Sequence, residues 1–80
     1  MPWISIASTQ YGAVLLDKKK GSYWQVNDSG AFIVDGIEHG RSIDEIVNGL
    51  VETFDVDLQQ AQEDVINLVR ELVDLGMMKW

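Results

Sequence analysis

The chain has 80 residues, of which 46% are hydrophobic and 24% charged, and its formal net charge is −7. These values are typical of one small globular domain and exclude a disordered tail, a fibre or a disulfide scaffold. Because cysteine is absent and only one histidine is present, the sequence excludes thiolate zinc sites, cysteine nucleophiles and histidine-rich metal sites. We therefore expect a single domain over residues 1–80 with no cofactor and no metal.

The sequence lacks the patterns of membrane insertion and of export. Uninterrupted apolar runs reach only four residues, as in residues 13–16, whereas spanning a bilayer takes about 20. The first residues show no basic stretch followed by an apolar one, as a secretory signal would. We expect a soluble, cytoplasmic protein with no membrane partner.

Negative charge is concentrated in the second half of the chain. Residues 1–41 carry four acids and four bases, whereas residues 42–80 carry nine acids and only two bases, which gives the net −7. Such a surface repels phosphate backbones, so we expect no nucleic-acid partner. The three consecutive lysines, residues 18–20, are followed by glycine, which predicts the exposed tip of a hairpin.

The first third of the chain has the composition of β-strands. Apolar and small polar residues alternate over residues 4–8, and aliphatic, β-branched and aromatic residues fill residues 13–16 and 23–26. Residues 17–21 lie between the last two segments and supply a turn. These segments predict an antiparallel hairpin with the first segment as a third strand.

Two helices are predicted next, each with its own start signal. Residues 27–29 offer capping side chains for a first helix that runs to about Glu38. Ser42 and Glu45 have the spacing of a capping box, in which each side chain satisfies a backbone donor of the other residue. Apolar residues then recur with helical spacing as far as Phe54, which predicts the second helix.

A third helix is predicted from Asp57, which has capping-box spacing to Gln60, to Leu75, before the stop signal Gly76. About three residues separate it from the second helix, and so short a junction forces a helix-turn-helix corner. The predicted fold class is therefore α+β: a small winged helix-turn-helix with a three-stranded antiparallel sheet followed by three helices.

The third predicted helix carries two apolar stripes. At 100° per residue, one stripe points toward the core and comprises Ala61, Val65, Leu68, Leu72 and Leu75. The second comprises Ile66, Val69 and Val73, with Gln62 in the same sector and Arg70 at its border. This second stripe fits either a wide core face or one wall of a groove beside an edge strand, where an extended peptide could add as a strand. Periodicity alone leaves both interpretations open.

Motifs for catalysis are missing from the sequence. It contains no G-x-S-x-G, no H-E-x-x-H, no P-loop and no paired carboxylates in a predicted cleft. His39, in an interhelical turn, is expected to be a solvated loop residue. Asp28 and Ser29 are similar to the pair at which acyl carrier proteins accept their prosthetic arm, but carriers are all-helical and have Leu where this chain has Gly30. We expect that the protein is not an enzyme.

Short motifs follow one another in a set order along the chain. They are Gly12-Ala-Val-Leu-Leu-Asp, a Lys/Gly turn, Ser22-Tyr-Trp-Gln-Val-Asn, Ser29-Gly-Ala, Ser42-Ile-Asp-Glu-Ile-Val, Phe54-Asp-Val, Asp64-Val and Leu72-Val-Asp-Leu-Gly-Met. Over roughly residues 10–78 this series resembles the PqqD-like family, the RiPP recognition element of ribosomal natural-product pathways. A freestanding copy is most similar to the leader-binding proteins of lasso-peptide biosynthesis. The departures are small, with Val26 where the family often has Leu and Ser29 where it often has Thr.

The resemblance implies a non-catalytic adaptor that binds the leader segment of a precursor peptide as a strand added between the third strand and the third helix. It also implies a separate leader peptidase and an ATP-dependent cyclase as partners, and it favours the groove interpretation of the second stripe. The implied peptide-binding residues are Tyr23, Trp24, Gln25 and Val26 on the strand, and Gln62, Ile66, Val69, Arg70 and Val73 on the helix. Strand alternation puts Tyr23 and Trp24 on opposite faces and leaves open which face is the core.

Two other classes of protein are compatible with the sequence. A winged helix can bind DNA, although the third predicted helix carries the acids Glu63, Asp64, Glu71 and Asp74 against the single base Arg70. An acidic carrier or a structural subunit of a larger complex is the other alternative.

Overall fold

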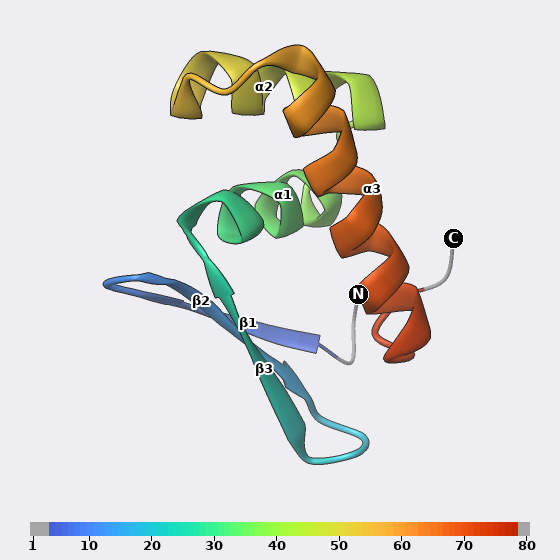
Figure 1. Cartoon of the computed structure of the whole chain (residues 1–80). Helices are drawn as coiled ribbons and strands as arrows, with labels where there is room; N and C mark the ends of the chain where they lie inside the picture. The colour runs from blue at the N-terminus through green and yellow to red at the C-terminus, as the bar shows by residue number, and fades with distance from the viewer. Residues whose placement is uncertain (1–3, 79–80) are drawn as a thin grey trace.

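A computed structural model describes residues 4–78, in which three strands precede three helices (Figure 1). The strands are β1 (Ile4–Thr9), β2 (Gly12–Asp17) and β3 (Ser22–Asn27), and the helices are α1 (Asp28–Glu38), α2 (Ile43–Phe54) and α3 (Leu58–Asp74). The predicted class, an antiparallel sheet followed by three helices, is confirmed. Within residues 4–78, no helix combines the length and apolar character needed to cross a membrane.

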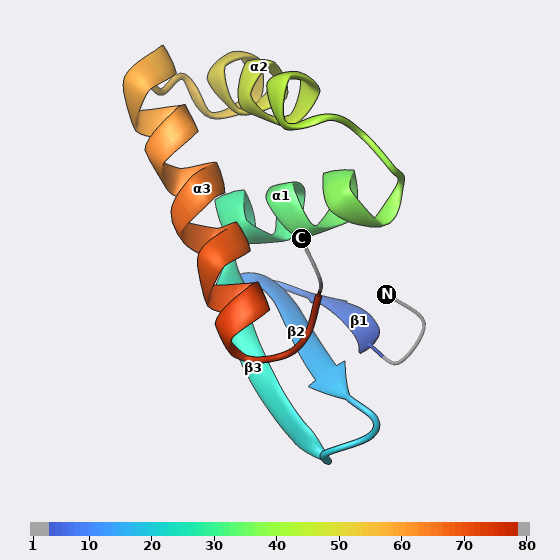
Figure 2. The same ribbon diagram turned by 90° about the vertical axis from the view of Figure 1, so that its right-hand side faces the viewer.

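The sheet has the order β1-β2-β3, so that β2 is central and β3 is an edge strand. The helices lie on one side of this sheet, with α1 packed against it and α2 on the far side of α1 (Figure 2). For this reason Leu15 is completely buried, whereas its neighbour Leu16 is 39% exposed on the other face. In the β2–β3 register, Trp24 lies opposite Leu15 and Tyr23 opposite Leu16. Trp24 therefore faces the helices and Tyr23 faces away, which decides the alternation that the sequence left open.

The turn between β2 and β3 is held by Asp17, which is only 2% exposed. Its Oδ1 accepts hydrogen bonds from the backbone N–H groups of Lys19, at 2.9 Å, and Lys20, at 3.1 Å. The Lys20 ammonium group in turn donates to the Leu75 carbonyl oxygen at 3.2 Å. The lysine tip is exposed as predicted, and it is also joined to the C-terminal end of α3.

Each helix begins after the capping residue that the sequence predicts. The Asn27 side chain accepts the Gly30 N–H at 2.9 Å at the start of α1, and the Asp57 side chain accepts the Gln60 N–H at 2.8 Å at the start of α3. At the other end of α3, Gly76 adopts a left-handed conformation with φ 74°, which stops the helix.

The start of α2 is a complete capping box. The Ser42 hydroxyl accepts the Glu45 N–H at 3.1 Å, and the Glu45 carboxylate accepts the Ser42 N–H at 3.0 Å. The hydrogen bond from the Ser42 backbone N–H to the carboxylate, followed by the effect of the Ser42 side chain and a smaller contribution from the charge of Arg41, holds the pKa of Glu45 below its ordinary value of 4.5. The ionised carboxylate is therefore the form that stabilises the folded state.

We expect Glu45→Gln to destabilise the domain near neutral pH, because it keeps the shape of the side chain but removes the charge. A lowered folded-state pKa stabilises above the unfolded-state pKa, and this contribution is lost as pH falls through the folded-state pKa. The stability difference from wild type should therefore shrink as pH is lowered below 4.5, in urea titrations at a series of pH values. Glu52→Gln, at an exposed position of α2, is the control. A stability difference between wild type and Glu45→Gln that does not change with pH would contradict this account.

The core lies between the covered face of the sheet and the three helices. Its most deeply buried side chains come from β2, α1, α2 and α3, namely Leu15, Val34, Ile46, Leu50, Val65 and Leu72. Helices α1 and α2 are in close contact at Gly36, where an added Cβ would lie 2.7 Å from Ile46 Cγ1 and 3.1 Å from Cδ1. Since Ile46 is 1% exposed, its side chain has little space to move aside.

Gly36→Ala should lower the free energy of unfolding by about 1–3 kcal/mol, because overpacking outweighs the gain in helix propensity of about 1 kcal/mol. Urea unfolding measures the effect. Ile46→Ala alone should cost about 2–5 kcal/mol, but it removes the atoms that the new methyl group at position 36 would meet. The double variant should therefore be more stable than the sum of the two effects predicts. If the effects of the two substitutions on the free energy of unfolding simply add, contact with Ile46 is not the reason why position 36 requires glycine.

Candidate functional site

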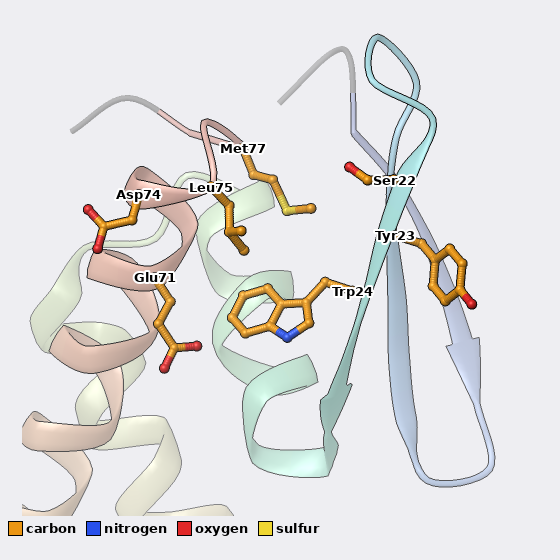
Figure 3. A pocket seen from close by; sticks show the side chains of 7 residues that line it. All are labelled: Ser22, Tyr23, Trp24, Glu71, Asp74, Leu75 and Met77. Carbon is orange, nitrogen blue, oxygen red and sulfur yellow. The ribbon is translucent and has the colours of Figure 1, made fainter.

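A cavity of about 410 Å³ lies between β3 and the C-terminal half of α3 (Figure 3). It is lined by Ser22, Tyr23, Trp24, Glu71, Asp74, Leu75 and Met77. Trp24, Leu75 and Met77 turn their side chains toward the space between strand and helix, whereas the Tyr23 ring points away from α3 (Figure 3). The cavity thus has largely apolar walls and borders an edge strand.

A second cavity, of about 230 Å³, lies between α3 and the start of α1. It is lined by Asn27, Ser29, Gly30, Ile33, Asp64, Asn67, Leu68 and Glu71. Glu71 lines both cavities and so marks where they meet. We call the surface formed by these two cavities the β3–α3 groove. Its α3 residues recur at helical spacing along one face of the helix.

The outer edge of β3 has no partner strand among the described residues, since β3 pairs only with β2. Such an edge presents free backbone N–H and C=O groups, which can pair with another extended chain. Because the groove runs beside this edge, an added strand could bond to β3 and direct every second side chain toward α3.

The structure brings part of the predicted strand set to the groove. Tyr23 and Trp24 line the larger cavity, and Val26 is half-buried against the core. Gln25 is exposed and lies with Tyr11, Val26 and Asn27 around a separate shallow cavity of about 280 Å³. Trp24 is therefore the strand residue whose side chain contributes most directly to the groove.

The predicted helix set is placed differently. Val69 is 7% exposed and belongs to the core, so the expectation that it forms a groove wall is wrong. Conversely, Leu75 was expected in the core but is 45% exposed and lines the larger cavity, whereas Leu68 packs against the core as expected and also lines the second cavity. The buried face of α3 is rotated toward Val69, which leaves the flank with Leu68 and Leu75 beside β3.

The other four predicted helix residues, Gln62, Ile66, Arg70 and Val73, are exposed and line neither cavity of the groove. On a helical wheel they occupy the flank of α3 opposite to Leu68, Glu71 and Leu75. Their part in peptide binding stays a prediction.

Glu71 and Asp74 line the groove but are not among the peptide-binding residues expected from the sequence. Met77 also lines the larger cavity, although it is 3% exposed and belongs to the core. A usable signal was present, since Glu71 follows Leu68 by three residues and precedes Leu75 by four, which puts all three on one face.

The side chains that could bind a metal ion or act in catalysis either have structural roles or lie apart from one another. Among residues 4–78 there is no group of three or more His, Asp or Glu that could hold a metal ion. His39 is exposed at the end of α1, with its Nδ1 3.3 Å from Asp35 Oδ1. The Ser29 hydroxyl donates to Asn27 Oδ1 at 3.0 Å and so belongs to the cap of α1.

The fold and the groove define a small winged helix-turn-helix domain with an open sheet edge beside its last helix. Residues 12–78 match the family described as coenzyme PQQ synthesis protein D, PqqD. The chain belongs to this family, which confirms the resemblance seen in the sequence.

Two solved structures are similar to the whole fold. One is described as lasso peptide synthetase B1 complexed with the leader peptide; it is 39% identical, the match covers 95% of this chain and 89% of that chain, and the TM-score is 0.84. The other is TbiB1 in complex with the TbiA(beta) leader peptide, with 24% identity, coverage of 95% and 88%, and a TM-score of 0.85. The second likeness supports the fold alone. A comparison with curated proteins gave no match.

Proposed function

We propose that this protein is a non-catalytic adaptor of RiPP biosynthesis that binds the leader segment of a ribosomal precursor peptide, as in lasso-peptide pathways. The observation that carries the proposal is the unpaired edge of β3 beside the largely apolar β3–α3 groove. The similar lasso peptide synthetase B1 structure, which is complexed with a leader peptide, supports it.

In the proposed complex, the leader adds to the sheet as a fourth strand next to β3. Backbone hydrogen bonds to β3 supply affinity whatever the leader's side chains are, while alternate side chains enter the groove and supply selectivity. Trp24 and Leu75 would contact the apolar part of the leader, with the buried Met77 supporting them from the core, and Leu68 would extend this contact toward α1.

The adaptor would present the bound leader to separate enzymes. We propose a leader peptidase that cleaves the precursor and an ATP-dependent cyclase that closes the ring, all in the cytoplasm, where the precursor is synthesised. The adaptor itself performs no chemistry in this scheme and needs no cofactor. A chain of this size has room for one core and an open groove, but little for a water-excluding active site.

The test uses the peptide encoded by a short open reading frame beside the gene of this protein. Titrated into the isotope-labelled protein, this peptide should shift the backbone amide resonances of β3 and of the groove face of α3. Methylating the peptide's backbone nitrogens one at a time should abolish binding at alternate positions, because only every second amide faces β3. A scrambled peptide of the same composition is the control. A uniform response to methylation would contradict strand addition.

DNA binding is the competing function, since the architecture is compatible with it. Helix α3 would have to enter a groove of the duplex, yet its charged side chains are Glu63, Asp64, Glu71 and Asp74 against Arg70. The leader-binding proposal predicts affinity for duplex DNA at about 0.15 M salt no better than roughly 10⁻⁴ M, the weak end of non-specific binding. A sequence-specific gel shift at micromolar protein would favour the DNA-binding alternative.

A further inference from the structure

Glu71 occupies the junction of the two cavities of the β3–α3 groove. Its carboxylate extends from α3 into the space in front of the Trp24 indole (Figure 3). Within residues 4–78, neither Glu71 nor Asp74 has a hydrogen bond or an ion pair from its side chain. Among the described residues, the groove therefore holds an exposed carboxylate without a side-chain partner, opposite an aromatic ring.

The charged residues that line the groove in the described chain are all acidic: Asp64, Glu71 and Asp74. Lys20, in the turn between β2 and β3, has its ammonium group hydrogen-bonded to the Leu75 carbonyl oxygen, and it does not line either cavity. An acidic side chain directed into the groove would be repelled by these carboxylates, whereas a basic one would be attracted.

We propose that the groove selects leaders that direct a Lys or Arg side chain toward α3, where its charge pairs with Glu71. The inference rests on the proposed function and specifies the class of leader. The aliphatic stem of such a side chain can cover Leu75, which is 45% exposed, and keep this part of the apolar wall away from water while the charged end reaches the carboxylate. A cation above the indole of Trp24 gains a further cation–π attraction.

The experiment selects binders from a display library of random peptides long enough to pair along the six residues of β3. The bait is the full-length wild-type protein or one of two variants, Glu71→Gln and Glu63→Gln. Each variant removes one negative charge from α3, but Glu63 is exposed and lines neither cavity, so that it controls for net charge. Wild type and Glu63→Gln should enrich Lys or Arg at one strand position, and Glu71→Gln should lose this preference.

One enriched peptide then enters a double-mutant cycle. Glu71→Gln in the protein, or Lys→Gln in the peptide, should each weaken binding roughly three- to tenfold, the combined scale of an exposed ion pair and a cation–π contact. The two changes together should cost little more than either one alone. Glu71→Lys should reverse the preference and bind the Lys→Glu peptide better than the original.

The outcomes separate this inference from the proposed function. Peptides that shift the β3 amide resonances but show no basic preference, or that keep the preference with Glu71→Gln, would overturn the inference and leave leader binding intact. If neither the library nor the neighbouring leader yields a peptide that shifts the β3 amide resonances, the proposed function fails and the inference fails with it.

Discussion

Val69→Glu should unfold a large fraction of the protein. Val69 is 7% exposed within the core cluster, so the variant loses a packed aliphatic side chain and must either bury a carboxylate without a partner or open the core. We expect a loss of at least about 3 kcal/mol, which is a large part of the stability of so small a domain. Circular dichroism melts and the dispersion of amide resonances measure the change.

Ile66→Glu is the matched control for Val69→Glu, because it places the same side chain on the same helix. Ile66 is 45% exposed, so a glutamate there can stay in water. The control should change the free energy of unfolding by less than about 1 kcal/mol. If both variants melt alike, or if Val69→Glu stays folded, the placement of Val69 in the core is wrong.

Leu75→Ser should weaken leader binding and leave the domain folded. Leu75 follows the last turn of α3, lines the larger cavity and is 45% exposed, so a bound strand would complete its burial. Losing that contact should cost about 1–2 kcal/mol of binding, or roughly a five- to thirtyfold rise in Kd. Titration with the leader by fluorescence anisotropy, together with a thermal melt, separates binding from stability.

Ile66→Ser tests the flank of α3 that the sequence favoured. Ile66 and Leu75 have the same exposed fraction, 45%, and receive the same substitution, but only Leu75 lines the groove. We expect Ile66→Ser to bind the leader like wild type. The reverse result, with Ile66→Ser impaired and Leu75→Ser unaffected, would restore the sequence-based site and contradict the groove described here.

The fold could be predicted from the sequence because its signals are local. Asn27, Ser42 and Asp57 mark helix starts through side chains that bond to backbone groups three residues later. The hairpin follows from turn residues between two strand-like segments, and the stop at Gly76 follows from its left-handed conformation. Each of these interactions spans only a few residues, so one sequence contains them all.

The groove face of α3 could not be predicted in the same way. Hydrophobic periodicity measures the direction in which apolar side chains point on average. By this measure the flank with Ile66, Val69 and Val73 is the apolar one beside the core stripe, so the sequence pointed to that flank. Which flank lies beside β3 depends on how α3 crosses the sheet, and this is fixed by contacts between distant segments. One such contact is the hydrogen bond from Lys20 to the Leu75 carbonyl, which joins residues 55 positions apart.

The helices all lie on one side of the sheet, and this has a consequence for any enzyme that must act on the bound leader. A guest strand beside β3 would direct half of its side chains into the groove and the other half outward, in line with Tyr23, which is 74% exposed. These outward side chains and the bare face of the host sheet would form one continuous surface. A processing enzyme could then recognise a composite surface that neither chain presents alone. It would bind the loaded adaptor in preference to the empty adaptor or the free precursor.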